Sequence, residues 1–384
     1  MPRQLGFKLI AAFFCVGFAC MNFILGLWSE CIIYQHALPG AKKINSQISM
    51  VYNLANIVPV IYSILINRFK IKTNEFRIQS ILLFINIVNS IAYFFLWDYT
   101  ASGLPMGMYA LSFVCGITAT FSMVVVFPLC HGHPHSAITS VSSGMSFSGV
   151  LCSLVATYIQ KVGKTPNFSS SVFFGVMILP SSILGFLALY YIKYAAPEEK
   201  SEGYKLVSTE LVELQNEQDA DEEGSAVDVV IAMGVVSAVY YFILPGLIPY
   251  VFQHFPEKES DVFQSYATLY AMLINFVARL MVSLRRNYTF RVEFLLLSLI
   301  GAYLIYTAVP GSFVLNGYAL VGMFVALSYF QGYLATVLYI IGPDRFNGEL
   351  KKKGTSRLIG VVNQIGSTVG TYANGFLVMH QVFG

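Results

Sequence analysis

Amide and hydroxyl side chains interrupt several long apolar stretches of the sequence. At about 1.5 Å per residue, Asn22 lies about 21 Å beyond Lys8, and Asn53 and Asn56 share one helical face. Such groups inside a membrane must find hydrogen-bonding partners or face a polar cavity. Taken singly, each fits an interhelical hydrogen bond; taken as a belt from both halves of the chain, they favour a central cavity for a neutral polar solute. The belt consists of Asn22, Asn53, Asn56, Ser146, Ser148, Gln331, Asn363 and Gln364.

Two charged residues lie in or near the same apolar stretches. Glu30 lies about 33 Å from Lys8 along a straight helix, whereas Arg279 lies about 9 Å from Arg285, so their depths differ too much for a direct ion pair. Glu30 has three open interpretations: an exposed interfacial acid, a hydrogen-bond acceptor for substrate, or a proton-binding group. Arg279 either extends to the inner headgroups or has a functional role.

Other chemical patterns are weak. His131, His133 and His135 alternate around Pro134, which is more typical of a solvated loop than of a metal site. No zinc-protease motif, phosphate loop or nucleophile–base pair lies at membrane depth, so we do not expect an enzyme, a metal site or a cofactor.

Small residues have a packing interpretation. Segments 142–144, 148–149 and 366–370 carry small residues at the spacing that lets helices approach closely. The six cysteines lie in or at the ends of apolar stretches without a CxxC pair, which indicates packing rather than disulfides.

The overall composition predicts the kind of protein in which these polar residues lie. Hydrophobic residues make up 56% of the 384 residues and charged residues only 11%, against about 25% charged in soluble domains. This composition excludes disorder and predicts an integral membrane protein whose surroundings are a lipid bilayer. The net charge of +3 offers no basic surface for nucleic acid.

Apolar runs long enough to cross the bilayer occur eleven times, which predicts an all-α polytopic protein with about eleven transmembrane helices. The predicted spans are 8–34, 44–66, 78–97, 104–130, 136–160, 172–194, 227–252, 262–284, 292–310, 318–341 and 357–381.

Charge placement predicts the orientation. With a cytoplasmic N-terminus, 17 of the 23 Lys and Arg residues fall in cytoplasmic segments, five on the other face and Arg279 within a span. The C-terminus is then extracellular. The sequon at Asn167 falls outside and is expected to be glycosylated, whereas the one at Asn287 falls inside.

One hydrophilic segment divides the chain. It holds ten of the twenty acidic residues, from Glu198 to Glu223, and reads as a cytoplasmic linker. The expected units are a six-helix bundle at 1–196, the acidic linker at 197–226 and a five-helix bundle at 227–384. This 6+5 arrangement is typical of transporters in which two bundles rock around a central site, although a polytopic protein with a regulatory loop shares it.

An ordered set of short segments carries a family resemblance. The segments are Gly26-Leu27-Trp28-Ser29-Glu30, Leu38-Pro39, Leu54-Ala55-Asn56-Ile57-Val58-Pro59, Phe95-Leu96-Trp97, Pro128, Gly144 with Ser148-Gly149, and Asn363-Gln364-Ile365-Gly366-Ser367. In order and spacing they resemble the eukaryotic riboflavin transporter family. The resemblance implies facilitated riboflavin uptake through an eleven-span bundle in the plasma membrane, with Glu30 as the family's span-one acid. It also suggests that Trp28 stacks on the flavin ring while amides and Glu30 bind its imide or hydroxyl groups.

The sequence departs from this pattern at two positions. Gly132 stands where the family often has Arg, and Met145 where it often has an acid. The alternative is the equilibrative nucleoside transporter family, which segments 331–336 and 342–343 resemble. Arg279 falls near that family's span-eight arginine, but the acid that precedes it there is absent.

Overall fold

The computed structural model describes the chain in segments separated by short gaps and by the acidic linker. These segments are 6–39, 43–69, 74–130, 133, 135–161, 166–194, 225–244, 246–284, 290–346, 349–380 and 382–383. Most of the linker and the Asn287 sequon therefore lie outside the described residues. Helices dominate these segments, and no strand longer than an isolated bridge between Ala101 and Leu104 occurs in them. The all-α prediction is confirmed.

Helices fill all eleven predicted ranges. The N-terminal helices are α1 (Phe7–Ser29), α2 (Cys31–Ala37), α3 (Lys43–Leu54), α4 (Ile57–Phe69), α5 (Glu75–Leu96), α6 (Met106–Cys130), α7 (His135–Leu154) with its π-helical end η1 (Val155–Gln160), and the span Ser170–Tyr194, which starts with α8 (Ser170–Phe173) and η2 (Phe174–Ile178). The C-terminal helices are α10 (Val227–Ile243), α11 (Ile248–Val251), α12 (Glu257–Leu284), α13 (Arg291–Thr307), α14 (Gly317–Asp344) and α15 (Glu349–Met379).

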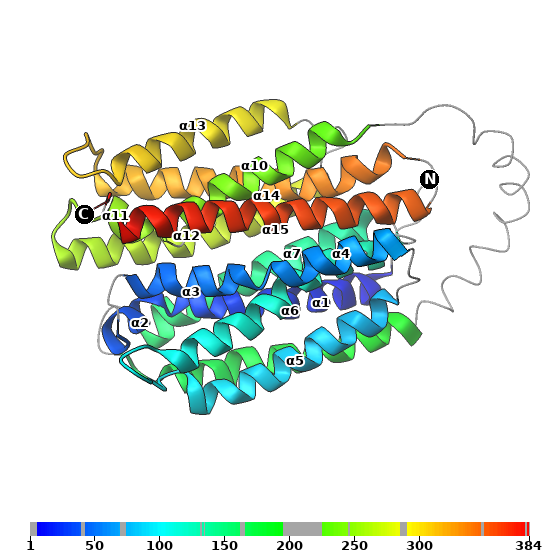
Figure 1. Ribbon diagram of the computed structural model, residues 1–384, viewed down its shortest axis with the longest axis horizontal. Helices are drawn as coiled ribbons and strands as arrows, with labels where there is room; N and C mark the ends of the chain where they lie inside the picture. The colour runs from blue at the N-terminus through cyan, green and yellow to red at the C-terminus, as the bar shows by residue number, and fades with distance from the viewer. Residues whose placement is uncertain are drawn as a thin grey trace, which may run out of the picture.

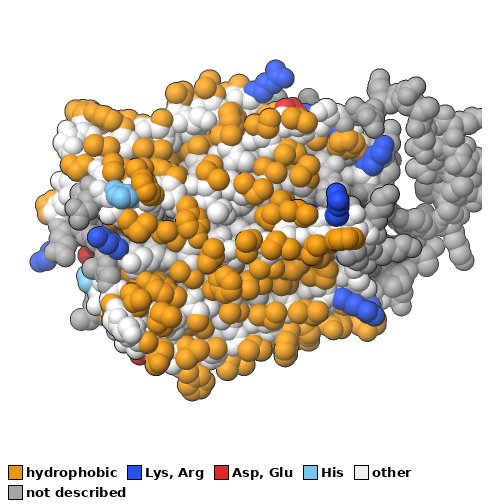
Figure 2. Space-filling model, viewed as in Figure 1, with side chains coloured by type: hydrophobic (Ala, Val, Ile, Leu, Met, Phe, Trp, Pro, Cys, Tyr) orange, Lys and Arg blue, Asp and Glu red, His pale blue; other side chains and the backbone are white. Residues whose placement is uncertain are grey.

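Eight of the described helical segments are long and apolar enough to cross a membrane, and α10 is a shorter apolar helix. Figure 2 shows a face covered by hydrophobic side chains, with most charged side chains near the two ends of the long axis. The start of α1 and the end of α15 lie at opposite ends of the bundle (Figure 1). The number of crossings and the orientation stay predictions.

Three predicted spans are interrupted, two of them beside a proline. The first breaks at Glu30, between α1 and α2. The second breaks at Ala55 and Asn56, because Pro59 lacks the N–H that would bond to the Ala55 carbonyl. The seventh ends at Leu244, whose extended backbone (φ −108°, ψ 132°) suits a residue that precedes proline.

Asparagine caps fix two helix starts. Asn74 and Asn316 precede α5 and α14, and each side chain accepts a hydrogen bond from the backbone N–H three residues later, at 3.0 and 2.8 Å. Such a bond satisfies one of the free N–H groups at a helix start.

Glycines bring two helix pairs into backbone contact. A Cβ at Gly17 would lie 2.1 Å from the Val141 carbonyl oxygen, and one at Gly144 would lie 2.0 Å from that of Phe14, so α1 and α7 touch directly. In the same way, Gly366 and Gly370 fit against the carbonyl oxygens of Gly234 and Ala238, which joins α10 to α15. The predicted packing role of these small residues is confirmed.

Two histidines of the segment 131–135 make contacts in the structure, and the side chain of His135 is exposed. His135 is the first residue of α7 and contacts Asp344 at 3.3 Å, and His133 packs edge-on against Phe13. His131 lies outside the described residues. All six cysteines are free and four of them are buried, as the packing interpretation requires.

Candidate functional site

A central cavity lies between the N-terminal helices α1, α6 and α7 and the C-terminal helices α10, α12, α14 and α15. Its volume is about 630 Å³, counting the open solvent at its mouth. Aromatic and thioether side chains form most of the wall, including Tyr240, Tyr241, Tyr339, Met123 and Met272. A lining of this kind suits a flat organic solute.

A connected hydrogen-bond network crosses this cavity. Asn275 lies at its centre: its Oδ1 accepts from Ser146 Oγ at 2.7 Å and from Arg279 Nε at 3.0 Å. Its Nδ2 donates to Gln331 Oε1 at 2.6 Å. Arg279 Nη1 also donates to Ser142 Oγ at 2.7 Å. The network therefore joins α7 of the N-terminal part to α12 and α14 of the C-terminal part.

Arg279 brings a positive charge to the cavity wall. Its guanidinium is held between helices by Asn275 and Ser142, which contradicts the alternative that it extends to the headgroups. No carboxylate of the described residues forms an ion pair with it, and its Nη2 makes no hydrogen bond to them. A cation without a counter-charge at low dielectric favours an electron-rich ligand group beside it.

Trp28 closes one end of the central cavity. Its ring meets those of Tyr52 and Tyr241 edge-on, with centroids 6.5 and 6.0 Å apart. The indole is only 7% exposed, and its Nε1 has no hydrogen-bond partner among the described residues.

Four of the ten candidate residues line the central cavity: Trp28, Ser146, Gln331 and Asn363. Asn363 accepts a hydrogen bond from Ser237, and its Nδ2 lies 3.7 Å from Met123 Sδ. Their contact with substrate stays a prediction.

Three candidates instead hold α3 and the break that follows it against the C-terminal α15. Asn56 Nδ2 donates to Thr368 Oγ1 at 2.7 Å and to Ser367 Oγ at 3.1 Å. Asn53 Nδ2 donates to Thr371 Oγ1 at 3.0 Å. Gln364, whose backbone carbonyl also accepts from Asn56, does not line the central cavity either.

The remaining candidates are buried inside the N-terminal part. Asn22 donates to Ser181 and Ser182 at 2.7 and 2.9 Å, and Ser148 bonds to its own helix.

Glu30 is fully buried, so its interpretation as an exposed interfacial acid is wrong. Its Oε2 accepts from Gln160 at 3.2 Å, and its Oε1 has no partner among the described residues.

Several cavity residues were not singled out in the sequence. Asn275 lies four residues before Arg279, the spacing of one helical face, and this signal could have added Asn275 to the charged residue already noted. Tyr240, Tyr241 and Tyr339 had no such signal, because the sequence contains 24 tyrosines with nothing to mark these three.

Comparisons with known proteins identify the family and the fold of this chain. Residues 3–383 match the family model described as solute carrier family 52, riboflavin transporter. No curated protein matches the chain. Among solved structures, a mutant of the peptide transporter POT in complex with sulfate aligns with a TM-score of 0.60 at 13% identity, covering 100% of this chain and 93% of that one.

At this identity the structural likeness shows a transporter fold alone. The family match gives no support to the nucleoside alternative, and solute transporters are not an enzyme class. The match extends over nearly the whole chain, across both cavity-forming parts: this chain belongs to solute carrier family 52, the riboflavin transporters.

Proposed function

We propose that this protein carries riboflavin across the plasma membrane by alternating access of two bundles, 1–196 and 227–384. The observation that carries the proposal is the cavity between these parts, where Arg279, which has no ion-pair partner among the described residues, lies among amides and tyrosines. A transporter that rocks around a central site needs its binding groups at this place.

The lining of the central cavity complements the two ends of riboflavin. The flavin ring is flat and aromatic, which suits contact with Trp28, Tyr241 and Tyr339. Its carbonyl oxygens accept hydrogen bonds and suit Arg279 Nη2, whereas its ribityl hydroxyls both donate and accept and suit Gln331. Membership of a riboflavin transporter family supports the same substrate.

The charges in the cavity support facilitative rather than ion-driven uptake. Among the described residues that line the central cavity, Arg279 is the only charged one. A guanidinium keeps its proton at physiological pH, so this lining offers no carboxylate to bind a coupling proton or sodium ion.

Uptake into proteoliposomes tests the proposal. Purified protein should give saturable uptake of labelled riboflavin that unlabelled riboflavin inhibits and that adenosine and uridine do not. The rate should change little with imposed proton or sodium gradients. Saturable adenosine uptake that ignores flavins would contradict riboflavin as the substrate, and a strict sodium or proton requirement would contradict facilitative transport.

A further inference from the structure

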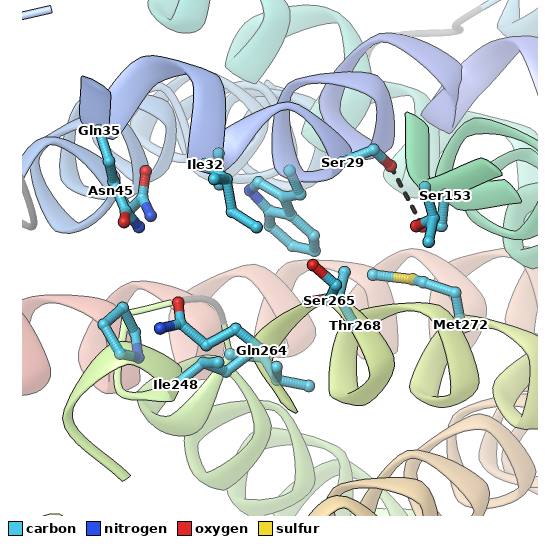
Figure 3. Close-up of a pocket in the computed structure, with 15 residues that line it drawn as sticks. Ser29, Ile32, Gln35, Asn45, Ser153, Ile248, Gln264, Ser265, Thr268 and Met272 are labelled. Carbon is cyan, nitrogen blue, oxygen red and sulfur yellow. Dashed lines mark hydrogen bonds between the residues drawn. The ribbon is translucent and has the colours of Figure 1, made fainter. Parts of the chain in front are cut away.

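A second pocket adjoins the central cavity, and we name it the outer pocket (Figure 3). Its lining includes Gln35, Asn45 and Gln264, and its volume is about 660 Å³ with the open solvent at its mouth. Trp28 and Met272 line both the outer pocket and the central cavity. These two side chains therefore stand between the two spaces.

The outer pocket has a different chemical character from the central cavity. Its described lining contains no charged residue, whereas the central cavity contains Arg279. Gln35 and Asn45 lie together on one side of the pocket, and Gln264 lies on the other, beside the apolar Ile248 (Figure 3). Amides between apolar surfaces suit a neutral ring that carries hydrogen-bonding groups at its edge.

Two buried polar atoms in this lining lack partners. Trp28 Nε1 is a donor and Asn45 Oδ1 is an acceptor, and neither has a hydrogen bond to the described residues. Both residues are buried, at 7% and 3% exposure. Buried polar groups need complementary partners, and a ligand that carries both an acceptor and a donor could supply them to this donor and this acceptor.

We propose that the outer pocket is a second binding site for riboflavin, which holds the imide-bearing ring before it passes Trp28 and Met272 into the central cavity. An imide offers a carbonyl oxygen for Trp28 Nε1 and an N–H for Asn45 Oδ1. Ile32 and Ile248 supply apolar surface for the ring. This inference rests on the proposed function, because it assigns a further site to the same substrate.

Binding stoichiometry tests the second site in the purified full chain. Equilibrium dialysis should find two riboflavin molecules per wild-type protein. Asn45→Leu, which keeps the size but removes the acceptor, should weaken one site at least tenfold and leave one. Ser153→Ala is the matched control in the same pocket: the Ser153 hydroxyl is already bonded to Ser29 at 3.2 Å, so two sites should remain.

A modified ligand gives an answer that needs no variant. Riboflavin methylated at the imide nitrogen lacks the N–H for Asn45 but keeps the carbonyl oxygens for Arg279. It should bind to one site on the wild-type protein, even where Asn45→Leu fails to fold.

The outcomes separate the two proposals. A single site in the wild-type protein that Asn45→Leu leaves unchanged overturns the outer site, while riboflavin uptake in proteoliposomes still supports the proposed function. An absence of saturable riboflavin uptake by the wild-type protein overturns the proposed function itself.

Discussion

Arg357 on α15 forms an ion pair with Glu75 on α5, with 3.1 Å between Nη2 and Oε1, and so joins the C-terminal part of the chain to the N-terminal part. Both side chains are largely shielded, at 12% and 19% exposure. His135 and Asp344 join α7 to α14 at the same end of the bundle. The outer pocket lies between the two parts toward the opposite end. The two parts are therefore joined by side-chain contacts at one end, which we call the tied end, and enclose a pocket toward the other, as the proposed alternating access requires of one of its states.

Removing the Glu75–Arg357 ion pair should destabilise the state in which the tied end is closed. Glu75→Gln should lower the ratio of this outer-facing state to the inner-facing state by about 5- to 30-fold, because a shielded pair of this kind contributes about 1–2 kcal/mol. The apparent affinity for riboflavin presented to the outer pocket should fall with it. Titration of uptake in oriented proteoliposomes measures this change.

Two controls accompany this prediction. The charge-swapped Glu75→Arg/Arg357→Glu double variant should recover most of the affinity. Arg345→Gln breaks an exposed ion pair to Asp228 that lies within the C-terminal part, and it should leave the affinity unchanged. Equal affinity in the wild-type and Glu75→Gln proteins would show that the pair does not hold the tied end closed.

Arg279 should set the affinity of the central cavity. Arg279→Gln removes the positive charge and should raise the KM for riboflavin about 5- to 150-fold, since one buried hydrogen-bond partner is worth about 1–3 kcal/mol. Arg279→Lys keeps the charge but loses the planar fork, and its KM should lie between the two. Uptake kinetics over a range of riboflavin concentrations give the values. A KM for Arg279→Gln within twofold of wild type would remove this residue from the site.

Depth within the membrane could be predicted from the sequence, but rotation about the helix axis could not. On α1, Met21, Leu25 and Trp28 form the stripe that faces the central cavity. Asn22 lies at the same depth as Met21 but about 100° around the helix, where it meets Ser181 and Ser182. The sequence alone does not say which of these two faces of α1 meets the cavity, because apolar and amide side chains can both line a binding site. Only the tertiary packing decides between them.

The spans and the close-packed helices were easier to predict, since apolar run length and small-residue spacing are local properties. The interruptions at Glu30 and Asn56 were missed, because an apolar run continues through each break. The role of Arg279 was left open for a different reason. Its distance from Arg285 fits both a side chain that extends to the inner headgroups and one that lines the cavity. Only the contacts with Ser142 and Asn275 decide between these two interpretations.

Asn56 should act on the movement of the two parts rather than on substrate choice. Its side chain joins the break between α3 and α4 to Ser367 and Thr368 of α15, and it lines neither the central cavity nor the outer pocket. Asn56→Ala should therefore lower the maximal uptake rate while the relative inhibition by different flavins stays the same. A changed order of flavin inhibition would instead place Asn56 in contact with substrate.

Gly144 should be intolerant of any side chain. Alanine there would put its Cβ 2.0 Å from the Phe14 carbonyl oxygen, so α1 and α7 must separate. We expect Gly144→Ala to cost about 1–3 kcal/mol and to lower the unfolding temperature in detergent. Gly322→Ala on α14 is the matched control, because no atom lies within 4 Å of the added Cβ. Equal unfolding temperatures for the two variants would contradict the backbone contact.

Asn167 should carry the N-linked glycan, and this tests the orientation. The residue is exposed between η1 and α8, and Ser169 of its sequon caps α8 by accepting from the Val172 N–H. Expression in a glycosylating host should give a mass shift that glycosidase treatment removes. Asn167→Gln should abolish the shift, and Ser169→Thr should keep it, because threonine preserves both the sequon and a capping hydroxyl. A shift that persists in Asn167→Gln and disappears in Asn287→Gln would place the arginines around residue 287 outside, which would reverse the orientation predicted from the charges.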